Sequence, residues 1–381
     1  MPFVLDGSYA ELSDEARAVG KAVEPIAAEV DAMSTVDRRV FDILAASGLW
    51  ELVVPASHGG RHARVDPLAI AVVREALMAS SSHLDSLFAL QGIGSYAITA
   101  GGTPEQQDRW LPQVLSGEAL AALALTEPEA GSDLKGIVTE LTPSGDGYVL
   151  DGEKAYISNG GAAAFYTVLA REGSGYTLVL VPADSPGLTI AATPELAAPH
   201  VLGDLTFAAV PVAADQRIGE PGQGFDLVLA TLAVFRLSVA GASLGLAQAA
   251  LDEAVRHAAG RRQFGKPLAR QGAVAEMLAD SWAELEAARL LTYRAGELAR
   301  ADPAGALHHS SMAKLTASEV AGRIVDRAVQ VMGRWGLVRD SKIERLTRQA
   351  RPMRIYEGAS QVLRLGIARA LVDEMDREEQ R

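Results

Sequence analysis

The feature of this sequence that most limits its fold is the change of hydrophobic period along the chain, from helical to alternating and back. Residues 11 to about 118 repeat apolar side chains at helical spacing, as in ELSDEARAVGKAVEPIAAEVDAM. From about residue 120, short alternating runs follow one another with turn residues between them, and the helical period returns after GEPGQGF, residues 219–225. Helices, then strands, then helices predict an α+β chain and not alternating βαβ units.

Two helix starts are marked in the N-terminal region. Ser13 is the predicted N-cap of the first helical pattern. In GGTPEQQDRWLPQVL, Thr103 is the predicted N-cap, Pro104 takes the first helical position and Gln106 stands three residues after the cap. That spacing is typical of a capping box, so a helix is predicted to begin there.

The middle region reads as several short strands. GYVLDGEKAYIS holds two alternating runs, and Asp151-Gly152 between them predicts a hairpin turn. FYTVLA and YTLVLVPAD follow, separated by Glu-Gly-Ser-Gly, and LTFAAVPV closes the region. We therefore expect a small antiparallel sheet or barrel over roughly residues 121–219.

The C-terminal region reads as long helices. RLSVAGASLGLAQAALDEAVRHAAG is apolar and rich in small residues on nearly every face, which predicts a helix buried in a bundle. Three more helical patterns cover about 271–300, 307–333 and 359–377.

Composition excludes several function classes. The chain has 381 residues, 49% of them hydrophobic, which is enough for two or three domains. Its formal charge of −13 disfavours nucleic-acid binding, and with no cysteine it has no disulfide, thiolate nucleophile or Cys-ligated metal. The N-terminus does not resemble a signal peptide, and its apolar stretches are interrupted before the roughly 20 residues of a membrane span. We expect a cytoplasmic protein without a membrane span.

Nucleotide-fold and metal motifs are missing from the sequence. No G-x-G-x-x-G follows a predicted strand, so a Rossmann site is not expected. The pair His308-His309 has no partner at metal-ligand spacing, and adjacent residues on a helix point in different directions. We expect no metal site.

Three stretches combine residues that could bind a flat, phosphorylated ligand, although each also has an ordinary interpretation. LALTEPEAGSD, residues 123–133, ends a strand in hydroxyls and a glycine, and AYISNGG, residues 155–161, ends another in an aromatic residue and a hydroxyl. GRRQFGKPL, residues 260–268, offers arginine forks for a pyrophosphate and a phenylalanine for an adenine, or simply a basic helix C-terminus.

Taken together, six stretches in this order resemble the acyl-CoA dehydrogenase family: ALTEPEAGSD, DGEKAYISNGG, GEPGQGF, RRQFGKPL, AVQVMGRWG and IYEGASQVLRL. The resemblance covers nearly the whole chain. It implies an N-terminal α-helical domain (1–119), a middle β-barrel-like domain (120–220) and a C-terminal four-helix bundle (221–381). It also implies FAD, held between the β-domain, the bundle and a neighbouring subunit of a homodimer or homotetramer.

The resemblance assigns flavin-binding roles residue by residue. The residues concerned are Leu125, Thr126, Gly131, Ser132, Tyr156, Ser158, Arg261, Phe264, Gln330, Gly333, Arg334, Ala359 and Gln361. Tyr156 would lie against the flavin ring, and the Ser158 hydroxyl would reach its N5. Arg261 and Phe264 would reach the FAD of the partner subunit.

The resemblance also makes Glu357, in IYEG, the catalytic base that removes the α-proton of an acyl thioester. A carboxylate with an ordinary pKa of about 4.3 is a poor base for that proton, so burial should raise its pKa. Ser132, Arg236, Tyr356 and Gly358 would contact the substrate. A second base position used in other branches of the family is Phe235 here, which favours Glu357.

The sequence departs from the family pattern at several positions, namely Ala233, Gly272, Arg334 and Ala359. The segment ADPAGALHH also lacks an arginine that some CoA-using members have. An acyl-ACP substrate, as in polyketide biosynthesis, is therefore the alternative to an acyl-CoA of fatty acid metabolism. A flavin oxidase or monooxygenase on the same scaffold, or a binding module, is a further alternative. The resemblance implies an electron-transfer flavoprotein as the electron acceptor.

Overall fold

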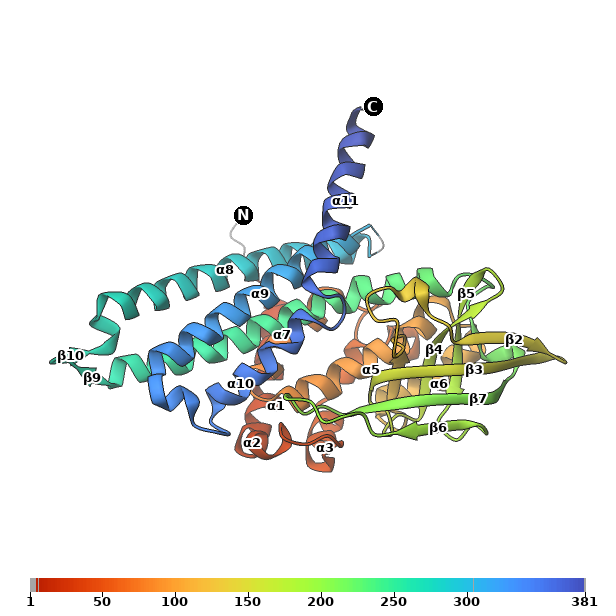
Figure 1. The fold of residues 1–381 in the computed structure, drawn as a ribbon, viewed down its shortest axis with the longest axis horizontal. Helices are drawn as coiled ribbons and strands as arrows, with labels where there is room; N and C mark the ends of the chain where they lie inside the picture. The colour runs from red at the N-terminus through yellow and green to blue at the C-terminus, as the bar shows by residue number, and fades with distance from the viewer. Residues whose placement is uncertain (1–4, 6, 304, 380–381) are drawn as a thin grey trace. The chain divides into compact units, whose positions relative to one another are not determined.

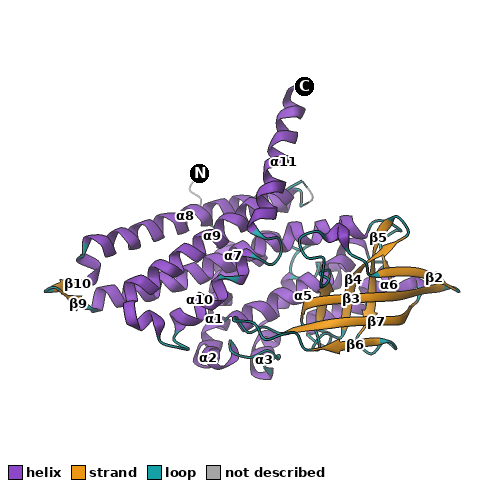
Figure 2. Cartoon of the chain, viewed as in Figure 1, coloured by secondary structure: helices purple, strands orange, loops and turns teal. Residues whose placement is uncertain are grey.

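A computed structural model describes residues 5, 7–303 and 305–379, so part of the N-terminal stretch used above to argue against a signal peptide lies outside the described residues. The chain forms two compact units from interleaved segments (Figure 1). Unit 1 contains Met1–Ala32, Pro67–Asp85 and Arg236–Arg381, and unit 2 contains Met33–Asp66 and Ser86–Phe235. The predicted α+β order of helices, strands and helices is confirmed (Figure 2).

Unit 1 is helical. Its elements, including the parts of α5 and α7 that it shares with unit 2, are α1 (Gly7–Val23), α2 (Ala27–Val30), α4 (Pro67–Met78), α5 (Ser82–Gly101), α7 (Gly224–Gly260), α8 (Gly272–Ala301), α9 (Leu307–Met332), α10 (Lys342–Ala350), α11 (Ser360–Glu379) and the hairpin β9 (Arg262–Gln263) and β10 (Lys266–Pro267). The three helical patterns predicted after residue 270 correspond to α8, α9 and α11, whereas α10 was not predicted.

Small residues on α7 let α4 pack closely against it. A Cβ atom at Gly241 or Gly245 would overlap the backbone carbonyls of Ala71 and Glu75. By length and composition α7 alone, among the described helices, could cross a membrane, but 72% of its most apolar window is buried in the protein. That burial is typical of a core helix.

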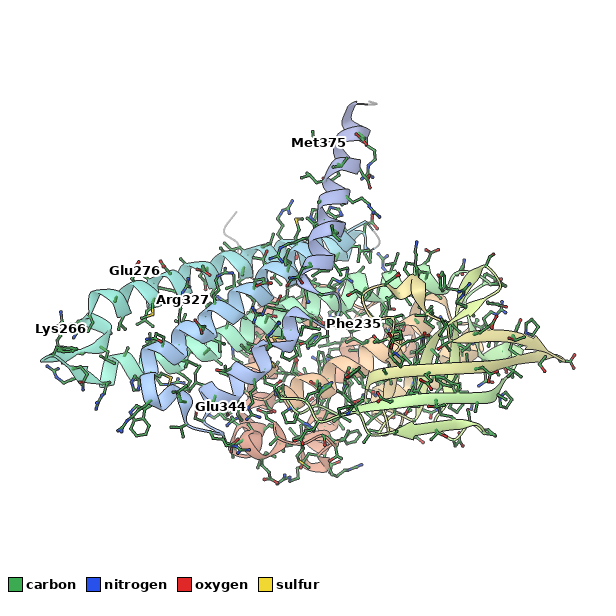
Figure 3. The ribbon with its side chains drawn as sticks, viewed as in Figure 1. Phe235, Lys266, Glu276, Arg327, Glu344 and Met375 are labelled. Atoms are coloured by element: carbon green, nitrogen blue, oxygen red, sulfur yellow. The ribbon has the colours of Figure 1, made fainter. Side chains whose placement is uncertain are left out.

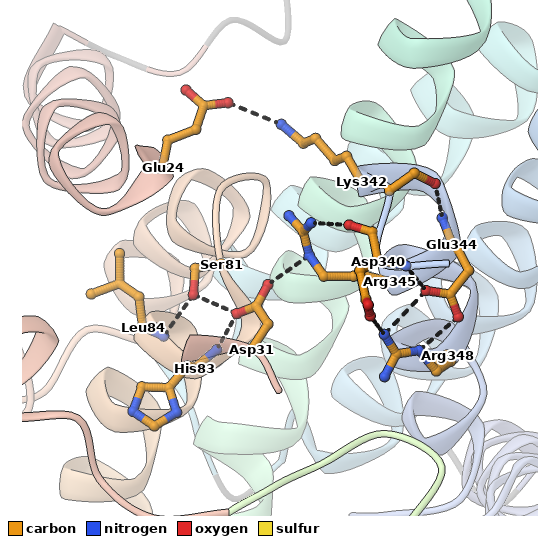
Figure 4. A network of polar contacts seen from close by, with 11 residues as sticks. Glu24, Asp31, Ser81, His83, Leu84, Asp340, Lys342, Glu344, Arg345 and Arg348 are labelled. Carbon is orange, nitrogen blue, oxygen red and sulfur yellow. Dashed lines mark hydrogen bonds and ion pairs between the residues drawn. The ribbon is translucent and has the colours of Figure 1, made fainter. Parts of the chain in front are cut away.

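A polar network in unit 1 ties the start of α5 to α10 (Figure 4). Asp31 accepts hydrogen bonds from Ser81 Oγ at 2.6 Å and from the His83 backbone N–H at 3.1 Å. Its other oxygen lies 3.5 Å from Nε of Arg345, and Lys342 pairs with Glu24 at 3.2 Å. The network therefore fixes the backbone from which the first turn of α5 begins.

Unit 2 combines helices with a sheet. Its further elements are α3 (Arg38–Ser47), α6 (Pro104–Ser116), β1 (Ala121–Ala124), β2 (Glu140–Ser144), β3 (Gly147–Ser158), β4 (Phe165–Glu172), β5 (Gly175–Pro182), β6 (Leu188–Ala191), β7 (Leu202–Val212) and β8 (Arg217–Ile218). The described strands order as β6-β7-β3-β2-β4-β5-β8, with β1 on β4. Most described pairs are antiparallel as predicted, but β4 runs parallel to both β1 and β2.

The predicted hairpin at Asp151-Gly152 is wrong. Both residues lie inside the continuous strand β3, and the turn is Gly145-Asp146, where Ser144 pairs with Gly147. Gly152 has φ 140°, at a register shift where the backbone of Thr139 comes too close for a Cβ atom. The glycine therefore serves a bulge with close backbone approach.

Of the two predicted helix caps, one is confirmed and one is wrong. Thr103 and Gln106 form the capping box of α6. Ser13 lies inside α1, because Tyr9 and Leu12 before it are buried on the same face as Ala16 and extend the apolar stripe toward the N-terminus.

Candidate active site

Glu357 lies in a strained segment between the short 3-10 helix η8 (Pro352–Arg354) and α11. Its φ is 50°, a left-handed conformation that is uncommon for a residue with a side chain, and Gly358 follows with φ 104°. Arg236 donates from Nε to the Glu357 carbonyl at 2.9 Å, and Lys314 donates from Nζ to the Gly358 carbonyl at 2.7 Å. Two cations from α7 and α9 thus stabilise this backbone conformation.

The carboxylate of Glu357 is buried without being satisfied. Its Oε2 atom is inaccessible to solvent and has no hydrogen-bond partner among the described residues. Burial raises the pKa of Glu357, because the charged form loses its hydration. The cations Arg74, Arg236 and Lys314 oppose that rise, and the negative charge of Asp85 adds to it.

The two clamping cations are themselves poorly solvated. The Lys314 side chain is fully buried, and burial lowers its pKa to about 8. Burial also lowers the pKa of Arg236, whose Nη1 donates to Ser311 Oγ at 3.0 Å. Glu357 therefore faces positive charge held at fixed positions, which is the arrangement expected around a group that must change its protonation state.

Phe235, at the alternative base position, is completely buried in unit 2. Its ring packs edge-on against Tyr96 at 5.8 Å and fills the space where Gly92 has no side chain. No carboxylate replaces Glu357 at this position.

In unit 2 the structure brings together the predicted flavin-lining residues of two motifs. The Ala155 backbone N–H donates to the Thr126 carbonyl at 2.9 Å, and the Tyr156 N–H donates to Asp204 at 2.8 Å. Tyr156 has φ 56° and its ring is 51% exposed. The loop after β1 and the end of β3 are thus joined through their backbones at one edge, which carries Thr126 and the exposed Tyr156 side chain.

A buried ion pair, not predicted from the sequence, supports that edge. Lys154 Nζ donates to the Leu125 carbonyl and to Glu127 Oε1, both at 2.9 Å. Glu127 also accepts from the backbone N–H groups of Val138 and Thr139. Both charged side chains are almost fully buried, so the pair fixes Leu125 in place. The sequence signal that could have indicated this pair is the lysine of GEKAY, which lies within a predicted strand.

The Ser158 hydroxyl lies on the same strand, and Nε2 of His200 is 3.0 Å from its oxygen. Sequence reasoning missed His200, because the loop between β6 and β7 carries no recognisable pattern. Gly131 leaves open space, since an added Cβ would meet only the Thr126 methyl at 3.9 Å. Ser132 is exposed in the same loop.

A flavin fits the groups that this edge of unit 2 presents. The exposed Tyr156 ring suits a flat aromatic face, and the hydroxyls of Thr126 and Ser158 suit its polar edge. The open space at Gly131 allows backbone to approach such a ligand closely. Among the described residues no group of three or more His, Asp or Glu could hold a metal ion.

The remaining predicted flavin residues lie in unit 1, some in the β9–β10 hairpin, some at the end of α9 and two shortly after Glu357 in the sequence. Arg261 and Phe264 belong to the β9–β10 hairpin, where Phe264 has φ 50° and is 93% exposed. Gln330, Gly333 and Arg334 are exposed at the C-terminal end of α9, where Arg334 stacks on Trp335. Ala359 and Gln361 flank the start of α11.

The hairpin is far from Glu357 within one chain. It precedes α8, whose 30 residues span about 45 Å, and Lys314 lies near the start of α9, just after the other end of α8. Figure 3 shows Lys266 of the hairpin at the opposite end of the bundle from α11. Arg261 and Phe264 therefore lie too far away to contribute to the site around Glu357 of the same chain.

Models of three domains match consecutive parts of the chain. They are described as the acyl-CoA dehydrogenase N-terminal domain, at residues 9–118, the middle domain, at 122–210, and the C-terminal domain, at 222–372. The domain boundaries predicted at 119/120 and 220/221 stay predictions.

Curated relatives match over nearly their full length. A cyclohex-1-ene-1-carbonyl-CoA dehydrogenase of Geobacter metallireducens is 37% identical over 361 residues, covering 92% of this chain and 94% of the relative. The CarC subunit of a caffeyl-CoA reductase–Etf complex of Acetobacterium woodii is 34% identical, with 90% and 92% covered.

Solved structures share the whole fold. Butyryl-CoA dehydrogenase from Megasphaera elsdenii superposes with a TM-score of 0.92 at 31% identity, covering 98% of this chain and 100% of that one. An acyl-CoA dehydrogenase from Bacillus anthracis in complex with FAD gives a TM-score of 0.92 at 26% identity, covering 100% of this chain and 69% of that one. The matching domain models, the relatives and the shared fold show that this chain belongs to the acyl-CoA dehydrogenase family, as its motifs predicted.

Proposed function

We propose that this protein catalyses the α,β-dehydrogenation of an acyl-CoA thioester to a 2-enoyl thioester, with Glu357 as the base that removes the α-proton. The observation that carries the proposal is the buried Oε2 atom of Glu357, which lacks a hydrogen-bond partner among the described residues. Because no described residue donates a hydrogen bond to this atom, its lone pair is available to a substrate proton.

As a member of its family, the chain is an oxidoreductase that acts on CH–CH bonds, and FAD is the cofactor of that family. When bound, FAD supplies the acceptor for the hydride that leaves the β-carbon. In this chain Leu125, Thr126 and Tyr156 would hold the flavin ring, with the Ser158 hydroxyl at its polar edge.

The residues around Glu357 prepare the proton transfer. Its raised pKa brings the carboxylate closer to the basicity that an α-proton beside a thioester demands. Arg236 and Lys314 fix the backbone of Glu357 and Gly358, so the carboxylate holds one orientation toward the substrate. The Glu357 backbone N–H would bind the thioester carbonyl, which makes the α-proton more acidic.

The substrate class is a small acyl thioester. One relative is named for a cyclohexene-ring CoA ester and one similar structure for butyryl-CoA, so both ring and short straight acyl groups are candidates. An acyl-ACP is the alternative, and it would not need contacts to the adenosine phosphate of CoA. The electron acceptor would be an electron-transfer flavoprotein, as the name of the Etf-complex relative suggests.

The functional assembly would be a homo-oligomer. Arg261 and Phe264 lie too far from Glu357 of their own chain, so their predicted contact with FAD requires a partner subunit. The exposed apolar side chains of α11 also favour a partner subunit, because Leu365, Leu371 and Met375 are 74%, 60% and 57% exposed.

The experiment that tests the function is anaerobic reduction of the bound flavin. The purified holoenzyme is mixed with butyryl-CoA, octanoyl-CoA or cyclohexane-1-carbonyl-CoA, and then with the same acyl groups on a carrier protein, while the flavin absorbance is followed. We expect rapid bleaching by at least one CoA ester and none in Glu357→Gln. Bleaching by carrier-bound groups alone would support the acyl-ACP alternative, and equal bleaching in Glu357→Gln would refute the assigned base.

The interface role of the hairpin has its own prediction. Arg261→Ala should lose FAD on dilution and gel filtration, because a cation that would bind the pyrophosphate across an interface is removed. Arg270→Ala, another exposed arginine of the same link, is the matched control and should keep its flavin. Equal flavin retention in both variants would contradict the role of Arg261.

A further inference from the structure

A buried pair of opposite charges lies beside Glu357 and has no part in the steps described so far. Arg74 in α4 donates from Nε to Asp85 Oδ1 at 2.9 Å and from Nη2 to Asp85 Oδ2 at 2.6 Å. Its Nη1 donates to Ser238 Oγ at 2.9 Å. The side chains of Arg74 and Asp85 are only 5% and 3% exposed. Three hydrogen bonds, two to Asp85 and one to Ser238, therefore hold the guanidinium in one orientation.

Stability alone does not explain this pair. Taking two charges out of water costs several kcal/mol per ion in typical proteins, and apolar replacements of buried ion pairs are often neutral or stabilising. The effect of the two charges on neighbouring groups is therefore the next point to consider.

Arg74 and Asp85 face the proposed base. The Arg74 guanidinium opposes the rise that burial causes in the pKa of the Tyr356 phenol, and its charge likewise opposes the rise in the pKa of Glu357. The charged and titratable groups with the largest influence on the Glu357 carboxylate come from several elements of unit 1. They are Arg74 on α4, Asp85 on α5, Arg236 on α7, Lys314 on α9 and the adjacent Tyr356. Among the charges that act on Glu357, Asp85 is the negative one.

The position of Asp85 is fixed from outside the site. Its backbone N–H donates to the Ser81 carbonyl at 3.2 Å, and Ser81 and His83 both donate to Asp31. Asp31 in turn pairs with Arg345 of α10 (Figure 4). The first turn of α5 therefore delivers the Asp85 carboxylate to one place against Arg74.

We propose that Arg74 and Asp85 are positioning residues that set the charge balance at Glu357. Asp85 neutralises Arg74, so Glu357 faces two uncompensated cations, Arg236 and Lys314, and not three. A third uncompensated cation would stabilise the carboxylate and make it a weaker base, whereas loss of Arg74 would leave a second buried carboxylate near it. The catalytic part of this inference rests on the proposed function, but its electrostatic part does not.

The test uses variants with opposite expected signs. Asp85→Asn leaves Arg74 without its counter-charge and should move the titration of Glu357 to lower pH. Arg74→Gln leaves the Asp85 charge alone and should move it to higher pH. The double variant Arg74→Met/Asp85→Leu removes both charges and should titrate close to the wild type. If one single variant fails to fold, the other still decides the sign.

Glu75→Gln is the matched control. Glu75 is the next residue of α4 and pairs with partly buried partners, Arg289 at 2.9 Å and the Tyr293 hydroxyl at 2.8 Å. Its loss should affect stability with little change in the titration of Glu357, because Glu75 is not among the main influences on the pKa of that group.

The first readout is an infrared titration of the protonated carboxyl band that disappears in Glu357→Gln, which needs no turnover. The second is the pH dependence of flavin reduction by a thioester, whose acidic limb should shift in the same direction in each variant. Unchanged midpoints in both single variants, or a double variant shifted as far as a single one, would overturn the proposal. Shifted infrared midpoints with an unmoved rate profile would support the electrostatic inference and refute Glu357 as the base.

Discussion

Two glutamates, one in each unit, differ in how the protein satisfies the carboxylate and in the direction of the pKa shift. Glu127 accepts hydrogen bonds from Val138, Thr139 and Lys154 at 2.7, 3.0 and 2.9 Å. Burial alone would raise its pKa, but these hydrogen bonds outweigh burial and hold the pKa below the ordinary value. Glu357 leaves Oε2 without a partner among the described residues, and burial raises its pKa despite three nearby cations.

The difference separates a structural carboxylate from a reactive one. Glu127 accepts hydrogen bonds from protein groups, so its negative charge holds Lys154 in place. Lys154 in turn binds the Leu125 carbonyl. At Glu357, Arg236 and Lys314 bind the backbone carbonyls of Glu357 and Gly358, and the Oε2 atom of the carboxylate has no hydrogen-bond partner among the described residues. A buried acid is available for proton transfer only where the groups around it have their hydrogen bonds and the carboxylate itself keeps an oxygen without one.

The largest effect is expected from Glu357→Gln. The rate of flavin reduction by substrate should fall by about 10²–10⁴-fold, the usual contribution of a positioned acid–base group. The melting temperature should stay equal or rise, because a neutral amide replaces a charge that burial destabilises. Stopped-flow absorbance measures the rate of flavin reduction, and thermal unfolding measures the melting temperature. A variant with a lower melting temperature and an unchanged rate would make Glu357 a structural carboxylate, not a reactive one.

The next largest effect is on stability, from Glu127→Gln. Removing one partner of a buried ion pair costs about 3–5 kcal/mol, because Lys154 then stays buried without a counter-charge. The control is Glu129→Gln, since Glu129 is exposed in the same loop. A denaturant midpoint in Glu127→Gln that matches the control would show that the pair does not support the flavin-facing edge of unit 2.

The pH dependence should carry opposite signs in the two variants. The pKa of Glu127 lies below its ordinary value, so its stabilisation is present above an unfolded-state pKa of about 4.3 and is lost as pH falls through the folded pKa. The pKa of Glu357 lies above the ordinary value, so its ionisation costs stability as pH rises from about 4.3 through the folded pKa. Melting curves from neutral to acidic pH should show the deficit of Glu127→Gln shrinking and any advantage of Glu357→Gln disappearing.

The sequence predicted the elements whose signals are local. The capping box at Thr103 and the long helices α8, α9 and α11 depend on neighbouring residues and on hydrophobic period. The prediction at Asp151-Gly152 was wrong because the same dipeptide fits a turn and a bulge. The contact that decides between them comes from Thr139, which directly precedes β2. A distant backbone approach of this kind leaves no local pattern.

The candidate site was predictable only where a motif carried it. Glu357 stands in a stretch that the family resemblance identifies. Arg74 and Asp85 are 11 residues apart on two different helices, both largely buried, and no motif links them. Lys314 reads as a surface lysine of a helix, and its complete burial follows from the backbone carbonyl of Gly358, 44 residues later. Such pairings arise from packing between segments distant in sequence.

The smallest effect expected is from Ser311→Ala. The Ser311 hydroxyl accepts from Arg236 and donates to the Leu307 carbonyl, so its loss should cost about 1 kcal/mol, the usual net value of a buried hydrogen bond. Ser318→Ala on the same helix loses only a hydrogen bond to the Leu315 carbonyl and serves as the control. If Arg236 orients the Glu357 backbone, Ser311→Ala should also slow flavin reduction, whereas Ser318→Ala should not. Equal rates in both variants would mean that Lys314 alone is enough to hold the base in place.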